Sequence, residues 1–141
     1  LCRGAELERV AQQSNHRMHE GFSHINEAVA LSAMYAANHL QGVKAIVCMT
    51  RTGLTPLLMS RIRSGLPIFA FTAQEKTQNR VSLYRGVTTV PFSHSSTEPE
   101  SIQKAIEELK QRNVVEKGDN IILTRGDING THTMTIVQIE D

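Results

Sequence analysis

The fold is decided by residues 44–56, which read KAIVCMTRTGLTP. Their first six residues form a short apolar run rich in Ala, Ile and Val, which is typical of a strand buried on both faces of a parallel sheet. Thr55-Pro56 then predicts the start of a helix, with Thr55 as the N-cap and Pro56 at the first helical position, where its missing N–H costs nothing. A buried strand that passes directly into a helix indicates an α/β protein.

The same alternation continues on both sides of this stretch. Gly65 is expected to close the helix, and a glycine at Gly42 is expected to end an earlier one. Three further helices are predicted, over residues 22–40, 74–83 and 98–112. Four further strands are predicted, over residues 66–71 (LPIFAF), 86–92 (GVTTVPF), 120–124 (NIILT) and 134–139 (MTIVQI). The last strand should run antiparallel to its predecessor, because a short connection rich in turn residues joins them.

The predicted architecture is a three-layer α/β/α sandwich. Its sheet should have about five strands, mostly parallel, with an antiparallel edge strand at the C-terminal end. Residues 1–141 fit a single domain, in which residues 1–21 are expected to be a connecting segment. Ligands of such sheets collect at the carboxyl ends of the strands, so the functional residues are expected there.

The composition excludes several function classes. Fifteen Lys and Arg against fourteen Asp and Glu give a net charge of +1, which creates no broad field for nucleic acid or an anionic membrane. No apolar run approaches the roughly 18 to 20 residues that span a bilayer, and the opening LCRGAELERV lacks a signal-peptide core. Cys2 and Cys48 lie in unlike surroundings and predict no disulfide framework. A cytoplasmic protein is therefore expected.

The sharpest candidate site is the segment between the first strand and its helix. Backbone N–H groups are concentrated there, and Thr50, Thr52 and Thr55 add hydroxyl donors. Gly53 lets the backbone approach a ligand closely, and Arg51 can supply positive charge. Together these residues predict a phosphate cradle. An alternative explains residues 50–56 equally well: Thr55 caps the helix and Gly53 turns the chain, and no ligand binds there.

A second candidate follows the fourth strand, where residues 125–133 read RGDINGTHT. We expect this segment to be a loop that closes over the same ligand, since its glycines give the backbone freedom to move. An ordinary long hairpin loop is the alternative. The candidate residues are Arg125, Gly126, Asp127, Asn129, Gly130 and Thr131.

Other chemistries have little support in the sequence. The segment at Thr50 is not a P-loop, because no Lys-Ser/Thr pair follows its glycine. His16, His19 and His24 lie near Glu20, but their spacing matches no strong zinc pattern. Cys48 is expected to be a small buried hydrophobe, and no paired nucleophile and base are visible. No catalytic or metal-binding residue is predicted in this chain.

Several segments resemble the C-terminal domain of pyruvate kinase, both in their amino-acid sequence and in their order along the chain. The matching stretches are ALSAMYAANHL (30–40), KAIVCMTRTGLTPLLMSRIRSGLPIFAFT (44–72), LYRGVTTVPF (83–92) and KGDNIILTRGDINGTHTMTIVQI (117–139). The first of these looks most like the bacterial branch that responds to AMP or sugar monophosphates. The resemblance covers nearly the whole chain.

The resemblance implies a parent enzyme that transfers phosphate from phosphoenolpyruvate to ADP, with Mg²⁺ and K⁺ bound in a (β/α)8 barrel. The stretches quoted contain none of that barrel, so this chain is expected to hold no cofactor and to be inactive alone. The resemblance implies that it contributes an effector pocket and one subunit interface of a homotetramer, beside its own N-terminal barrel. By this resemblance, the family's effector loop falls on Arg125–Thr131, and its phosphate loop falls on Thr50, Arg51, Thr52, Gly53 and Thr55.

Two departures from the family's pattern narrow the expected effector. The Trp and Arg that hold the second phosphate of fructose 1,6-bisphosphate in some members have no match between Pro91 and Lys110, and Leu54 replaces a frequent polar residue. A single-phosphate effector, a sugar phosphate or AMP, is therefore expected. The alternatives are an interface domain that binds no ligand and a stand-alone phosphate-binding α/β protein, for example a small phosphohydrolase.

Overall fold

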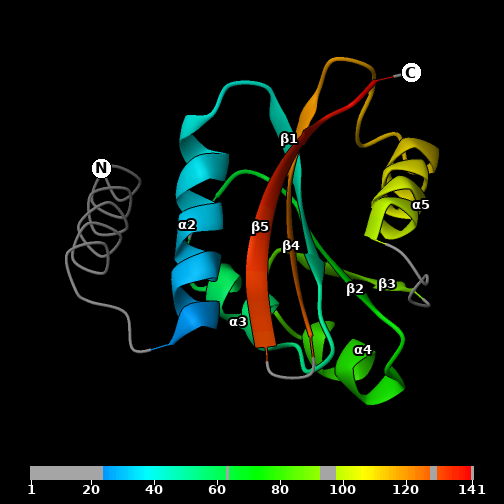
Figure 1. The fold of residues 1–141 in the computed structure, drawn as a ribbon. Helices are drawn as coiled ribbons and strands as arrows, with labels where there is room; N and C mark the ends of the chain where they lie inside the picture. The colour runs from blue at the N-terminus through cyan, green and yellow to red at the C-terminus, as the bar shows by residue number, and fades with distance from the viewer. Residues whose placement is uncertain (1–23, 63, 93–97, 128–129, 141) are drawn as a thin grey trace, which may run out of the picture.

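The chain alternates helices and strands as its sequence predicts (Figure 1). The structure is a computed structural model, and it describes residues 24–62, 64–92, 98–127 and 130–140. The elements, in chain order, are α2 (Ile25–His39), β1 (Val43–Met49), α3 (Leu54–Ser60), β2 (Ile68–Thr72), α4 (Glu75–Val81), β3 (Val87–Pro91), α5 (Glu98–Gln111), β4 (Asn120–Asp127) and β5 (Gly130–Gln138).

The five strands form one sheet in the order β3-β2-β1-β4-β5. β1 pairs in parallel with β2 and with β4, and β2 pairs in parallel with β3. β5 pairs antiparallel with β4 and forms one edge. The predicted mixed sheet with an antiparallel C-terminal edge strand is confirmed.

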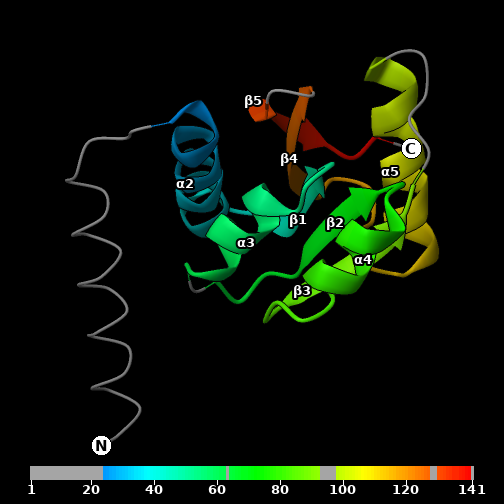
Figure 2. The same ribbon diagram turned by 90° about the horizontal axis from the view of Figure 1, so that it is seen from below.

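Alternate residues of β1 face two different layers of helices, because successive side chains of a strand point to opposite faces of the sheet. Ala45, Val47 and Met49 pack in a cluster with α5, whereas Ile46 and Cys48 pack with α2 and α3. Figure 2 shows α2 and α3 on one side of the sheet and α5 on the other. The apolar run at 44–49 is buried on both faces, and this burial gives the sandwich its three layers.

The start of α3 differs from the prediction. The N-cap is Gly53, in the left-handed conformation with φ 84° and ψ 5°, and the helix begins at Leu54. Thr55 and Pro56 are therefore the second and third helical residues, and both are buried. Proline is tolerated there because the first N–H groups of a helix have no intrahelical acceptor. The helix ends at Ser60, well before Gly65, and the Ser60 hydroxyl donates to the carbonyl of Leu57.

The second candidate segment is mostly strand, so the prediction of a long loop over residues 125–133 is wrong. β4 continues to Asp127 and β5 begins at Gly130, with Gly126 paired to Thr131. A register shift between Arg125 and Gly126 bends the ladder without ending it, as glycine commonly permits at a bulge. β-branched residues in 130–138 favour the extended conformation, which outweighs the turn chemistry of the glycines.

None of the helices in the described part of the chain is long and apolar enough to cross a membrane.

Cys48 lies inside β1 and is fully buried, with its Sγ atom 3.0 Å from Sδ of Met59. Burial raises the pKa of this thiol from 9.0 to about 12, although a hydrogen bond with Thr124 opposes the rise. The thiol is therefore protonated and unreactive in the folded protein. The prediction of a small buried hydrophobe is confirmed.

Cys48 should lower stability in alkaline solution. The unfolded chain loses the thiol proton above its pKa of 9.0, while the folded protein keeps it up to about pH 12. The free energy of unfolding should thus fall, through this group, by about 1.4 kcal/mol per pH unit within that window. Urea unfolding of the unaltered chain and of Cys48→Ala, at neutral and alkaline pH, checks this. The variant should show a shallower decline, and equal declines would contradict the assignment.

Candidate functional site

The strand order reverses beside β1. The first two crossovers place β2 and β3 on one side of β1, and the crossover through α5 returns the chain to β4 on the other side. In open α/β sheets, ligands bind beyond the carboxyl ends of the strands at such a reversal. The last paired residues of β1 and β4 in their ladder are Cys48 and Thr124. Both candidate segments therefore begin at the same edge of the sheet, one residue or two beyond this pair.

The β1–α3 loop, residues 50–55, is held together by its own threonines. Thr50 is buried, and its Oγ1 accepts a hydrogen bond from the N–H of Gly53 at 2.9 Å. Thr52 is exposed, and its Oγ1 accepts from the N–H of Leu54 at 3.4 Å. Two amides of the predicted cradle are thus already bonded within the loop. Each hydroxyl still has its own proton to donate to a ligand.

Two other amides of the loop remain available. Within the described residues, the N–H groups of Arg51 and Thr52 donate to no acceptor. Arg51 is exposed, as is Thr52, whereas Thr55 is buried. The part of the loop that could meet an anion is therefore its tip, at Arg51 and Thr52, rather than the buried Thr55 hydroxyl.

The other side of the β1–α3 loop is fixed to α4. Thr77 Oγ1 donates to the carbonyl of Arg51 at 2.7 Å, and Arg80 Nη1 donates to the carbonyl of Thr52 at 3.3 Å. Gly53 lies so close to α4 that an added Cβ would come within 2.9 Å of Val81 Cγ2. These contacts join residues more than twenty positions apart, so no local signal in the sequence indicated them.

Arg125 supplies a positive charge at the end of β4. Its side chain is partly buried, and its Nη1 atom is enclosed without a hydrogen-bond partner in the described part of the chain. By strand alternation it lies on the face of Leu123, which packs with α5. A guanidinium nitrogen without an acceptor favours an anionic partner.

The remaining candidates lie in the β4–β5 hairpin. Gly126 is exposed, and the backbones of Asp127, Gly130 and Thr131 take part in the ladder. Asn129 lies outside the described residues, and so do His16, His19 and Glu20 of the histidine group. His24 is the N-cap of α2 and is exposed. Among the residues that the structure describes, no group of His, Cys, Asp and Glu is arranged to hold a metal ion.

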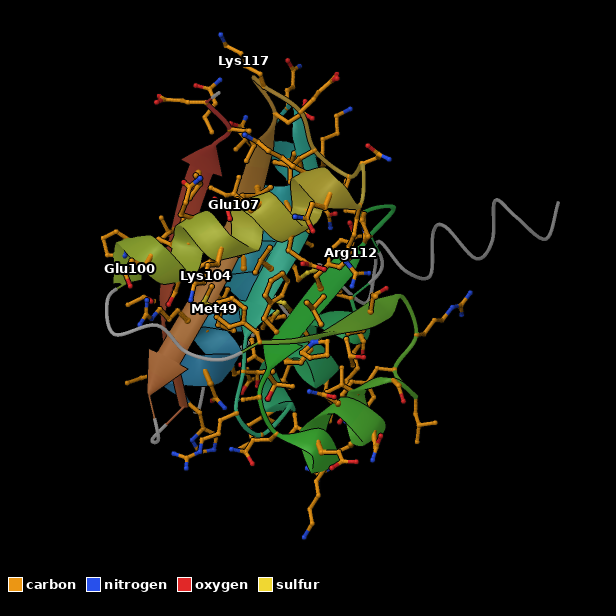
Figure 3. The ribbon with its side chains drawn as sticks, turned by 90° about the vertical axis from the view of Figure 1, so that its right-hand side faces the viewer. Met49, Glu100, Lys104, Glu107, Arg112 and Lys117 are labelled. Carbon is orange, nitrogen blue, oxygen red and sulfur yellow. The ribbon has the colours of Figure 1, made fainter. Side chains whose placement is uncertain are left out.

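The α5 side of the sheet offers a different surface. Figure 3 looks onto α5, where Glu100, Lys104 and Glu107 follow one another along the helix, and Met49 lies beneath it. A groove between α5 and the end of β5 is lined by Pro99, Ile102, Gln103, Ile106, Val137, Gln138 and Glu140. Among the described residues that line it, the one charged group is an acid, so this groove does not suit a phosphate.

The family comparison decides what this chain is related to. A profile of the family "Pyruvate kinase, alpha/beta domain" matches residues 27–137.

The chain belongs to this family.

Known pyruvate kinases match over nearly all of the chain. One from Buchnera aphidicola subsp. Acyrthosiphon pisum is 44% identical, covering 99% of this chain and 30% of the relative. Pyruvate kinase II of Salmonella typhimurium is 43% identical with the same coverage. A crystal structure of a pyruvate kinase from Cryptosporidium parvum superimposes with a TM-score of 0.77 at 29% identity, over 87% of this chain and 24% of that chain. The chain thus spans less than a third of the length of these pyruvate kinases.

Gly53 should be required for stability in this pyruvate kinase domain. Gly53→Ala places a Cβ at a φ of 84°, within 2.9 Å of Val81 Cγ2 and 3.3 Å of Thr77 Cγ2. We expect the free energy of unfolding to fall by about 2 to 3 kcal/mol. Gly65→Ala is the matched control, because an added Cβ there meets nothing within 4 Å. Denaturant unfolding measures both variants, and equal stabilities would show that α4 does not constrain the loop.

Proposed function

We propose that the chain is the C-terminal regulatory and assembly domain of a pyruvate kinase and that it binds a phosphorylated effector. The observation that carries the proposal is the meeting of two polar segments at the carboxyl ends of β1 and β4, where the strand order reverses. We call residues 50–53 with 125–126, of which Arg51, Thr52 and Gly126 are exposed, the strand-end site. The same residues match the family's phosphate and effector loops in the resemblance.

The strand-end site has the donors that a phosphate needs. The amides of Arg51 and Thr52 and the hydroxyl proton of Thr52 can each bond a phosphate oxygen, and Arg125 adds a guanidinium from the neighbouring strand. The chain has no Trp or Arg between Pro91 and Lys110 to hold a second phosphate. A single-phosphate effector is therefore proposed, with AMP or a sugar monophosphate as its class.

The proposed mechanism is thermodynamic linkage within the complete enzyme. The effector joins the β1–α3 loop to the end of β4 and thereby favours the arrangement of the homotetramer that is active. Such coupling is typically worth about 1 to 3 kcal/mol. Phosphoryl transfer from phosphoenolpyruvate to ADP, with its Mg²⁺ and K⁺, is assigned to the barrel domain of the parent enzyme. As part of a glycolytic enzyme, the domain is proposed to act in the cytoplasm.

Thr52→Ala should weaken effector binding. The change removes one hydroxyl donor to a charged phosphate, which is worth about 1.5 to 3 kcal/mol, or roughly a 10- to 100-fold rise in Kd. Calorimetric titration of the complete protein with AMP and with ribose 5-phosphate measures the effect. Thr88→Ala, which alters an exposed threonine on the opposite edge strand β3, should leave Kd unchanged.

The titrations also separate the proposals. Absence of binding by AMP, ribose 5-phosphate and fructose 1,6-bisphosphate would contradict effector binding and leave assembly as the role of the domain. Equal affinities of Thr52→Ala and the unaltered protein would place the ligand elsewhere. Phosphatase activity of the chain alone would favour a stand-alone phosphohydrolase instead.

A role in assembly is favoured independently by β5. This strand is the edge of the sheet, with a partner strand on only one side. Met134 and Ile136 are 37% and 48% exposed, which is unusual for large apolar side chains of one strand. An apolar edge strand is a ready partner for another strand. We propose that a second copy of the chain covers it.

Ile136→Lys should disrupt that assembly. Burying a lysine without a partner charge is unfavourable, so the association should weaken by at least tenfold. Sedimentation velocity of the complete protein over a range of concentrations measures the change. Thr88→Lys, on the other edge strand, is the matched control and should sediment like the unaltered protein. The same association state in both variants would contradict a role for β5.

A further inference from the structure

We propose that Thr77 of α4 is a positioning residue for the effector site: it sets the direction in which the tip of the β1–α3 loop presents its amides. The inference rests on the proposed function, because it concerns how that site is held. It assigns a role to α4, which contributes none of the candidate binding residues.

The hydrogen bond from Thr77 is the stronger of two that fix the loop. Its hydroxyl lies 2.7 Å from the carbonyl oxygen of Arg51, and the Thr77 side chain is buried. The companion bond from Arg80 to Thr52 is longer, at 3.3 Å, and solvent-exposed. A short, partly buried bond constrains its acceptor more than a long, exposed one. The orientation of the Arg51 carbonyl therefore depends mainly on Thr77.

The orientation of this carbonyl determines that of the next amide. In a planar trans peptide, the C=O of one residue and the N–H of the following residue point in opposite directions. Because the Arg51 carbonyl points to α4, the N–H of Thr52 points away from α4. The next peptide follows the same rule: the Thr52 carbonyl faces Arg80, and the Gly53 N–H points to Thr50 on the other side.

α4 itself is firmly attached to the sheet, so it can serve as a fixed support. Val81 is fully buried, and Gln78 Nε2 donates to the carbonyl of Thr72 at the end of β2. The N–H of Gln74 donates to the hydroxyl of Thr72 as well. The helix thus ties the direction of the loop amides to strand β2.

Loss of the Thr77 hydroxyl should release the Arg51–Thr52 peptide. Thr77→Val keeps the branched shape but leaves the Arg51 carbonyl without its donor. The peptide can then rotate, which turns a carbonyl oxygen towards the site and its amide away. A carbonyl oxygen repels a phosphate, so binding should suffer although no contact residue has changed. Thr77→Ser retains the donor and should preserve binding.

The experiment is a calorimetric titration of the complete protein with AMP and ribose 5-phosphate, for the unaltered chain, Thr77→Val and Thr77→Ser. Kd should rise at least tenfold in Thr77→Val and stay near that of the unaltered protein in Thr77→Ser. Ser82→Ala is the matched control, since the Ser82 hydroxyl also donates to a backbone carbonyl at 2.7 Å, that of Asn79, but within its own segment. It should bind normally.

Amide hydrogen exchange at Thr52 and Gly53 provides a readout of the loop itself. Exchange at Gly53 should accelerate in Thr77→Val while exchange within β1 and β2 stays the same. Should Thr77→Val fail to fold, Thr77→Ala replaces it, because alanine favours the helix.

Normal AMP affinity in a folded variant without the hydroxyl, or unchanged exchange at Gly53, would overturn the positioning role. If the unaltered protein binds none of the phosphorylated probes, the proposed function itself fails. The two failures are therefore distinguishable.

Discussion

The parallel pairing of β1 with β4 is the constraint on which the rest of the structure depends. β1 is buried on both faces and lies between β2 and β4, so every other strand is placed relative to it. β2 and β3 lie on one side of β1, and β4, which follows them in the sequence, lies on the other side. The segments that follow Met49 and Thr124 therefore begin at the same edge of the sheet. Two parts of the chain separated by seventy-five residues in sequence thus become neighbours.

The ends of β1 and β4 are where two parts of the domain meet: the part that contains β2 and α4, and the antiparallel β4–β5 pair. The β1–α3 loop is anchored through α4 to β2, and Arg125 belongs to the antiparallel β4–β5 pair. A ligand that contacts both would connect the half of the sheet containing α4 with the half that ends in the exposed edge strand β5. The proposed effector site and the proposed assembly surface therefore lie on the same structural unit, which offers a direct physical route for coupling between them.

The sequence predicted the layers well because they follow from short-range patterns. The apolar run at 44–49 and the amphipathic helix at 98–112 both lie within one or two residues of the observed elements. Two local predictions were wrong: Thr55 as the helix N-cap, and residues 125–133 as a long loop. In each case, contacts with a distant part of the chain outweighed the local preference for a cap or a turn. Gly53 caps α3 because α4 leaves room for no side chain, and the ladder with β5 extends β4 through Gly126.

The candidate site could be predicted only in part for the same reason. Thr50, Thr52 and Gly53 stood out by their position after a buried strand, but their contacts with Thr77 and Arg80 depend on how α4 folds back over the loop. That Arg125 follows the last paired residue of the strand beside β1 depends on the strand order, which no local pattern shows. The sequence does not show that the hydroxyl oxygens of Thr50 and Thr52 also accept hydrogen bonds from amides of their own loop, because those bonds depend on the local backbone geometry.

We propose above all that a phosphorylated ligand is held where β1 and β4 end. Amide chemical-shift changes, followed by NMR while isotope-labelled protein is titrated with AMP, locate the bound ligand on the chain. The largest changes should fall at residues 50–54 and 125–126, with smaller changes along α4. Changes confined to the α5–β5 groove, or to the surface of α2, would contradict it.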